Sequence, residues 1–508
     1  MDMFSHLMSG FSQALSLETL GFAFIGVLIG TLTGILPGIG PITAIALLIP
    51  MSYGMEPMSG LIMLIGIYYG SMYGGSTTAI LVKTPGEVAS IVTTLDGYEM
   101  AKQGKAGRAL SAAAIGSFIA GTLSTLGLML LAPVLAKAAF FFGSAEYFLM
   151  IVLAMSMVSS LTTGSALKAY ISTLFGLSIA MVGIDLQSSV PRYSFGIPNL
   201  LDGIDFVLVA IALFAIPEAL STMARKGKVA KMNVQNFKGS NWMTREDWKR
   251  SVGPFGRGSL LGFIIGVLPG LGPSLASFLS YGMEKKLSKR PEEFGKGAIE
   301  GVSGPEAANN AGVGGALVPL FTLGIPGSAT TALLMFIFMM YGMQPGPGMF
   351  NQHPELIWAI IASMYIGNVM LLILNLPLVG VFASLLKLPT VPLFVGVVAF
   401  SVLGVYGINY NQFDLMLLFG FGLIGYAMQR FDFPLAPAVM ALVLGPLLEQ
   451  NFRRSLDIAN WFTFFERPIS LVLSLIIIAI IIVPIVNMVF KKKRNNNKPL
   501  ETEIRTNA

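Results

Sequence analysis

The sequence predicts an all-α integral membrane protein with about 10–13 transmembrane segments in two repeats whose helices are broken by glycine and proline. Three observations support this fold class. Hydrophobic residues make up 54% of the 508 residues and charged residues only 11%. The mean hydropathy is +0.74, and a glycine- and proline-rich motif occurs twice within apolar runs. Soluble proteins carry roughly 25% charged residues, so we expect most of this surface to face lipid.

The apolar runs place the expected segments in order. In the first half they cover residues 18–36 with a continuation at 41–53, then 58–81, 108–138, 145–162, 165–184 and 204–223. In the second half they cover residues 256–283, 308–323, 328–343, 355–385, 388–408, 411–428, 434–448 and 467–490. The number of transmembrane segments is given as a range because a glycine–proline break can divide one span into two half-helices.

Charge divides the chain into parts. We expect a first transmembrane repeat at 18–223, a linker at 224–252, a second repeat at 253–449, a C-terminal transmembrane segment at 450–490 and a tail at 491–508. The linker and the tail are rich in Lys and Arg, which predicts that both are cytoplasmic. No Lys or Arg precedes Lys83, so we expect the N-terminus outside. The two repeats then enter the membrane from opposite sides, which is an inverted topology.

The duplicated motif interrupts an apolar run in each half. LGFAFIGVLIGTLTGILPGIGP ends at Pro41, and GSLLGFIIGVLPGLGP ends at Pro273. Their identities fall on glycine and proline, the residues that specify unusual backbone geometry. Helices broken at matching places in two halves are the best sequence indication of a secondary transporter's binding site. The predicted substrate-binding residues here are Pro37, Gly38, Gly40, Pro269, Gly270 and Gly272.

A second glycine-rich element follows in each half. YGSMYGGSTTAILVKTPGE and SGPEAANNAGVGGALVPLFTLGIPGSATT both contain a doubled glycine, then an apolar run, then Pro-Gly. A break of this kind leaves backbone N–H groups and the positive end of a helix dipole at one place, which suits an anion without a buried Arg. Further candidates for substrate binding are Ser76, Thr77, Thr78, Asn309, Asn310 and Ser328.

Helix packing is the alternative role for these small residues. Gly26, Gly30 and Gly34 lie four residues apart, and this spacing favours close packing of two helices. For the two proline-containing breaks a functional site is favoured. For Asn309 and Asn310 both interpretations stay open.

Glu306 is a candidate for binding the coupling ion, which we expect to be Na⁺ or H⁺. An isolated charge inside a membrane is costly and therefore indicates function, the alternative being a loop carboxylate at the interface. Backbone carbonyls at Gly74 and Gly314 are further candidates. We expect no metal centre and no organic cofactor. The chain has no Cys and only two His, so an imidazole-based metal site would have to use His6 or His353. The net charge is +6, and the basic residues lie beside hydrophobic spans, which predicts cytoplasmic loops and not nucleic-acid binding.

At these motifs the chain resembles the TctA family, the large membrane subunit of the tripartite tricarboxylate transporters. The resemblance rests on GTLTGILPGIGP, YGSMYGGSTTAILVKTPGE, GVLPGLGP and GPEAANNAGVGG, and extends from Gly21 to about Phe490. It implies a multi-pass permease of the bacterial inner membrane that imports tricarboxylates or related carboxylates and is driven by an ion gradient. It also implies two partners, a small four-helix membrane subunit (TctB-like) and a periplasmic solute-binding protein (TctC-like).

Two other function classes stay open, a membrane-embedded enzyme and an anion channel. The sequence has no P-loop, no H-E-x-x-H and no G-x-S-x-G motif. Duplicated anion sites with few acid–base residues suit binding better than chemistry. Saturable transport with counterflow would exclude an open pore.

Overall fold

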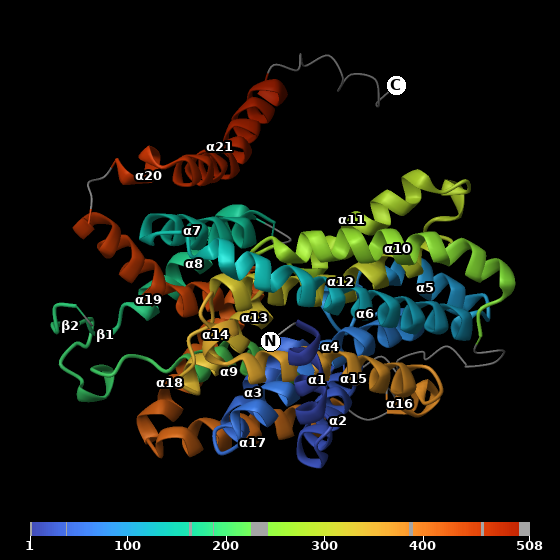
Figure 1. Cartoon of the computed structure of the whole chain (residues 1–508), viewed down its shortest axis with the longest axis horizontal. Coiled ribbons are helices and arrows are strands. Elements are labelled where there is room, and N and C mark those ends of the chain that lie inside the picture. The colour runs from blue at the N-terminus through green and yellow to red at the C-terminus, as the bar shows by residue number, and fades with distance from the viewer. Residues whose placement is uncertain are drawn as a thin grey trace, which may run out of the picture.

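The computed structural model describes residues 3–36, 38–161, 165–185, 187–224, 242–385, 390–458 and 462–496. Figure 1 shows that these residues form a bundle of helices, with the last helix, α21, along one edge. Among them the only strands are β1 (Gly183–Ile184) and β2 (Pro191–Arg192), which pair antiparallel. The all-α class is confirmed.

The elements of the first half are named in chain order. They are α1 (Met3–Ala14), α2 (Leu17–Ile35), α3 (Gly40–Ser52), α4 (Pro57–Val82), η1 (Val88–Ser90), α5 (Thr93–Lys102), α6 (Ala106–Ala139), α7 (Ser144–Leu161), α8 (Ala166–Ala180), η2 (Pro198–Leu200) and α9 (Phe206–Ala224).

The second half continues from the N-terminus of α10. Its elements are α10 (Arg245–Val267), α11 (Gly272–Leu287), η3 (Pro291–Glu293), α12 (Glu300–Leu323), α13 (Ala329–Met340), α14 (Met349–Gln352), α15 (Pro354–Asn375), α16 (Val379–Leu385), α17 (Thr390–Asn409), α18 (Gln412–Arg430), α19 (Leu435–Ile458), α20 (Thr463–Glu466) and α21 (Pro468–Asn496).

Within the described residues, six helices are long and apolar enough to cross a membrane, namely α2, α6, α9, α15, α17 and α19. Helices α3, α7, α8, α13 and α21 contribute shorter apolar stretches. The chain is therefore a multi-pass membrane protein. The number of spans and the inverted orientation stay predictions, and residues 225–241 of the expected linker and 497–508 of the expected tail lie outside the described residues.

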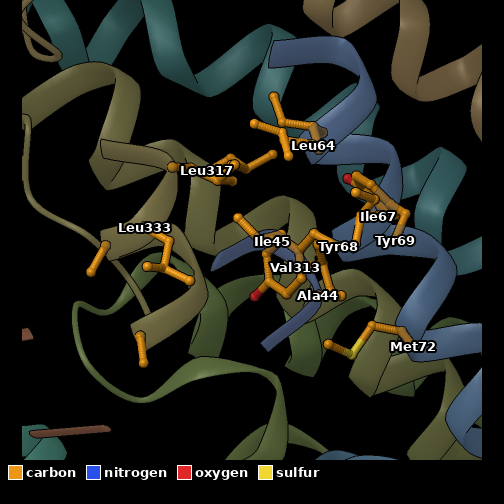
Figure 2. Close-up of a cluster of buried hydrophobic side chains, with 14 of the residues drawn as sticks. Ala44, Ile45, Leu64, Ile67, Tyr68, Tyr69, Met72, Val313, Leu317 and Leu333 are labelled. Carbon is orange, nitrogen blue, oxygen red and sulfur yellow. The ribbon is translucent and has the colours of Figure 1, made fainter. Parts of the chain in front are cut away.

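Two glycine-rich helices, α4 and α12, form the centre of the molecule. Every residue of α4 from Ser59 to Leu81 is buried, and so is every residue of α12 from Gly301 to Thr322. Figure 2 shows the apolar core where these helices meet α3 and α13, with Ile45, Leu64, Val313 and Leu333 among its buried side chains. Burial on all sides stabilises two helices whose glycine and proline content alone disfavours helix formation.

Glycine ladders join each central helix to one neighbour. Helix α2 packs most extensively on α4, and α10 on α12. A Cβ atom at Gly26, Gly30 or Gly34 would lie 2.2–2.5 Å from a backbone carbonyl oxygen of α4. The counterparts in α10 are Gly258, Gly262 and Gly266, where the same distance to α12 is 2.2–2.4 Å. The packing role predicted for the first ladder is confirmed, and the α2–α4 and α10–α12 pairs are each held by close backbone contact.

Some element boundaries differ from the sequence-based expectation. Helix α10 begins at Arg245, inside the expected linker, because Thr244 and Asp247 form a reciprocal capping box. Helix α12 begins at Glu300, before the expected 308–323, so Glu306 lies inside a helix. The single span expected at 355–385 is divided into α15 and α16 around Pro377, since the residue before a proline disfavours helix.

The short β1–β2 hairpin is attached to α19 by ion pairs. Arg453 contacts Asp185 at 2.8 Å, and Arg192 contacts Glu449 at 2.6 Å. The backbone N–H of Gln187 and the Arg453 guanidinium stabilise the Asp185 carboxylate and hold its pKa well below the usual range. The hairpin lies at the edge of the molecule in Figure 1.

Candidate functional site

A cavity of about 720 Å³ lies where several helix ends converge. Helices α3, α11 and α13 all begin at its wall, and the Pro85–Glu87 turn that precedes η1 forms another part of the wall. The remaining wall comes from α4, α7, α9 and α19, and from residues around the end of α18. Both proline-containing breaks therefore face one cavity, although they are far apart in the sequence.

The first break separates α2 from α3. Gly38 (φ +92°) and Gly40 (φ +60°) occupy the left-handed region that favours glycine. Pro41 follows at the second position of α3, where it removes one N–H that would otherwise need a partner. The helix has no side-chain cap. Its N-terminal residues Gly40, Pro41 and Ile42 line the cavity, so the positive end of the α3 dipole points there.

The second break separates α10 from α11 and has the same backbone geometry. Gly270 has φ +85° and Gly272 has φ +63°. Pro273 is again the second residue of the new helix, and α11 also lacks a side-chain cap. Here the N–H of Gly270 is already used, since it donates to the carbonyl oxygen of Gly327 at 3.1 Å.

The two breaks differ in what contacts their first glycine. A Cβ atom at Gly38 would lie 1.9 Å from Oε1 of Glu218, so this carboxylate of α9 lies directly against the first break. Gln429 donates to the other oxygen of Glu218 at 3.3 Å. At Gly270 the nearest atom is the backbone carbonyl oxygen of Ala154 in α7, 2.6 Å from the Cβ position.

The cavity wall carries no cationic side chain among the described residues. Its ionisable groups with a negative form are Glu87, Glu218 and the phenol of Tyr68. An anion in this cavity would be bound by helix N-termini and by hydroxyl groups such as those of Thr43 and Thr330. It would also be repelled by the carboxylates, and this repulsion is relieved if a cation binds nearby.

Five of the predicted substrate-binding residues line the cavity, namely Gly38, Gly40, Gly270, Gly272 and Ser328. Ser328 caps α13 in a capping box with Thr331, and its hydroxyl lies 3.2 Å from that of Tyr68. Pro37 lies outside the described residues, and Pro269 is not part of the wall. A binding role for these residues stays a prediction.

The other candidates lie in the core and do not reach this cavity. Ser76, Thr77 and Thr78 are buried in α4, and the Thr78 hydroxyl donates to the carbonyl of Gly75 at 2.9 Å. The Asn310 amide donates to the Ser117 hydroxyl at 2.6 Å, which joins α12 to α6. This arrangement favours the helix-bridging interpretation of Asn310.

Glu306 is the centre of a separate buried polar cluster. Its side chain has 0% exposure, and its two oxygens accept hydrogen bonds from the hydroxyl groups of Ser76 and Thr93. The other two ion candidates lie where helices pack closely. A Cβ atom at Gly74 would lie 2.3 Å from the carbonyl oxygen of Thr31, and one at Gly314 would lie 2.5 Å from the hydroxyl oxygen of Ser124. Of the three predicted ion-binding residues, Glu306 alone lies among oxygen-bearing side chains of this cluster.

Sequence reasoning missed Glu218 and undervalued Glu87. Both lie at the cavity, yet neither is among the predicted binding residues. From sequence, a position near the end of an apolar run indicates an interfacial carboxylate for Glu218, and the nearby Lys83 indicates an ion pair for Glu87. The Lys83 ammonium instead lies over the ring of Tyr98, 5.6 Å from its centroid. A usable signal was present, because Glu218 follows Pro217 inside an apolar run with no basic residue within four positions.

Comparisons with known proteins agree with the resemblance in these motifs. The family model described as "Tripartite tricarboxylate transporter TctA family" matches residues 20–440. An uncharacterized 52.8 kDa protein in the TAR-I ttuC' 3'region of Agrobacterium vitis is 45% identical over 497 residues, which cover 97% of this chain and 98% of that protein. An uncharacterized protein in the TAR-II ttuC' 3'region of the same organism is 47% identical over 211 residues, covering 41% of this chain and 87% of that protein.

No solved structure is significantly similar to the chain. The family match covers both proline-containing breaks, the Pro85–Glu87 turn and the whole of α12. By this match, the chain belongs to the TctA family of the tripartite tricarboxylate transporters.

Proposed function

We propose that the chain is the permease subunit of an ion-driven carboxylate importer in the bacterial inner membrane. The observation that carries the proposal is the convergence of two broken helices on one cavity. In secondary transporters, discontinuous helices of this kind point their N-termini at anionic substrate groups. A volume of about 720 Å³ is within the range of small-molecule sites, roughly 300–1,000 Å³.

The substrate class follows from the chemistry of the wall. Uncapped N-termini of α3 and α11, together with the hydroxyls of Thr43, Ser328 and Thr330, suit carboxylate oxygens. Together with the family match, this makes tricarboxylates or related carboxylates the proposed cargo. Since Glu87 and Glu218 oppose a polyanion, binding of a coupling cation would favour binding of substrate.

Partners enter the proposal through the family alone. TctA proteins belong to tripartite systems, and we propose a small TctB-like membrane subunit and a TctC-like periplasmic binding protein that delivers the carboxylate. A membrane-embedded enzyme and an anion channel are the alternatives.

The test is uptake by vesicles that contain the chain and its small subunit. With the matching binding protein and an inward cation gradient, we expect saturable accumulation of one member of a panel of labelled di- and tricarboxylates, and counterflow when unlabelled substrate is inside. Equal uptake without the binding protein would show a stand-alone carrier. Flux that never saturates would indicate a channel, and chemical turnover without flux would indicate an enzyme.

A further inference from the structure

The strongest unexplained feature of the core is a group of oxygen-bearing side chains beside the cavity. Glu306 and Asn309 lie three residues apart in α12 and therefore on one face of that helix. Glu87 and Ser90 come from the turn at η1, which packs against both α4 and α12. Ser76 of α4 and Thr93 of α5 complete the group through their hydrogen bonds to Glu306.

Gly75 allows Glu87 and Ser90 to lie close to α4. A Cβ atom at Gly75 would lie 2.8 Å from the Ser90 hydroxyl oxygen and 3.1 Å from Cγ of Glu87. The absence of a side chain at this position leaves room for both residues beside Ser76, the next residue of α4. The second glycine of the doubled pair, Gly75, thus allows the η1 turn to pack closely against α4.

Two members of the group have polar atoms without a partner. Both side-chain polar atoms of Asn309 lack a hydrogen bond of normal geometry, although the side chain is 0% exposed and lies beside Glu87. The hydroxyl oxygen of Ser90, also 0% exposed, is likewise without a partner. Buried polar atoms are nearly always satisfied by protein, water or an ion, so the side-chain oxygens of Asn309 and Ser90 are candidates for binding an ion.

The charge of the group also lacks compensation. Within the described residues, neither Glu87 nor Glu306 forms an ion pair, and the two carboxylates repel each other. A buried charge without a counter-charge is strongly unfavourable. The hydrogen bonds from the Ser76 and Thr93 hydroxyl groups to Glu306 offset only part of the cost of burying its ionised form. A cation bound between the two carboxylates would interact favourably with both charges, whereas one proton neutralises a single carboxylate.

We propose that Glu306, Glu87 and Asn309, with Ser90 beside them, bind a Na⁺ ion. The donors are all oxygens, which hard cations prefer. A divalent ion is disfavoured because Mg²⁺ demands near-octahedral geometry and retains several waters. The described residues contain no group of three or more acidic or His side chains for it. Glu87 also lines the cavity, so the ion lies next to the carboxylate substrate and reduces the repulsion that Glu87 would exert.

The coupling of this site to uptake rests on the proposed function, but Na⁺ binding itself is tested without transport. The purified protein is melted in NaCl and in choline chloride at equal ionic strength. We expect the melting temperature to rise with Na⁺ and to saturate, as for any ligand that binds the folded state. Glu306→Gln should abolish the rise, and Asn309→Ala should weaken the apparent Na⁺ affinity at least tenfold.

Glu146→Gln is the matched control. Glu146 is also a buried carboxylate, at 1% exposure, but it pairs with Arg467 and accepts from Ser470 away from the cavity. This variant should retain the Na⁺-dependent rise. If Glu306→Gln does not fold, Ser90→Ala provides the second measurement, with a smaller loss of Na⁺ affinity expected.

Equal melting in Na⁺ and choline would overturn the site, and so would a Na⁺ response that survives both Glu306→Gln and Asn309→Ala. A melting temperature that depends on pH but not on Na⁺ would indicate that a proton binds there and no metal ion does, and it would also overturn the site. Saturable Na⁺ binding with uptake that does not need Na⁺ would support the site and overturn only its coupling to transport.

Discussion

The two proline-containing breaks have the same backbone but different neighbours. Gly38 and Gly270 share a left-handed conformation, and both are followed by Gly-Pro at the start of an uncapped helix. The first break contacts the end of a side chain, Glu218, whereas the second contacts the backbone of α7 and is tied to Gly327. A side chain can rotate away and a packed backbone cannot. The first break is therefore the adjustable one, and the second is part of the framework.

Sequence alone predicts equal effects for alanine at the two breaks, and the structure predicts unequal ones. The largest effect is expected for Gly270→Ala. Its left-handed backbone costs about 1–2 kcal/mol, and the contact with the Ala154 carbonyl adds an overpacking cost of about 1–3 kcal/mol. We expect mainly a loss of folded protein, measured as membrane-inserted, monodisperse material after purification. Normal yield with normal uptake would contradict a framework role.

Gly38→Ala should act on transport more than on folding. The added methyl must displace the Glu218 carboxylate, whose Oε1 lies 1.9 Å from the Cβ position, while the backbone term of about 1–2 kcal/mol is the same. Obstruction of one charge-assisted hydrogen bond to substrate costs about 1.5–3 kcal/mol, or roughly ten- to a hundredfold in affinity. Uptake per inserted protein is the measurement. A specific activity equal to that of the wild type would remove Gly38 from the site.

Glu218→Gln sharpens the comparison from the opposite side. It keeps the shape of the side chain at the first break and removes its negative charge. We expect substrate to bind more tightly by on the order of 1 kcal/mol, a fall of about fivefold in the half-saturating concentration. Glu146→Gln, a buried carboxylate elsewhere, is the control and should leave this concentration unchanged. Weaker binding in Glu218→Gln would mean that the carboxylate assists the substrate.

Asp185→Asn tests whether a change far from both breaks affects transport, and the expected effect on uptake is none. The hydrogen bond from the Gln187 N–H and the ion pair with Arg453 lower the pKa of Asp185 in the folded protein. Both therefore stabilise the fold above the unfolded pKa of about 3.9, and this contribution is lost as the pH falls below it. The variant should melt earlier than wild type at pH 7, and this difference should shrink in acid. A difference that is constant with pH would contradict a role for the charge of Asp185.

Sequence could predict the class of fold and the location of the breaks, because glycine, proline and long apolar runs act locally. It could not predict which surfaces meet. Gly38 was found from its motif, but its neighbour Glu218 comes from α9, far away in the chain. Likewise Ser76 was assigned to substrate from its position in a polar run, yet its hydroxyl is directed to Glu306. The Thr244–Asp247 capping box was readable in advance and would have placed the start of α10.

The glycine ladders have a mechanical consequence. A Cβ atom added to any ladder glycine would lie 2.2–2.5 Å from a backbone oxygen of the facing helix. No layer of side chains therefore separates the two helices, and sliding needs side chains that can change rotamer. We therefore expect the α2–α4 pair and the α10–α12 pair each to move as a rigid body. If the chain transports as proposed, a change between inward and outward openings would bend it where no ladder holds it, at residues 38–39 and 268–271. The segments that face the cavity would then also be the hinges, and a carboxylate bound there, as proposed, would stiffen the points at which the protein has to bend.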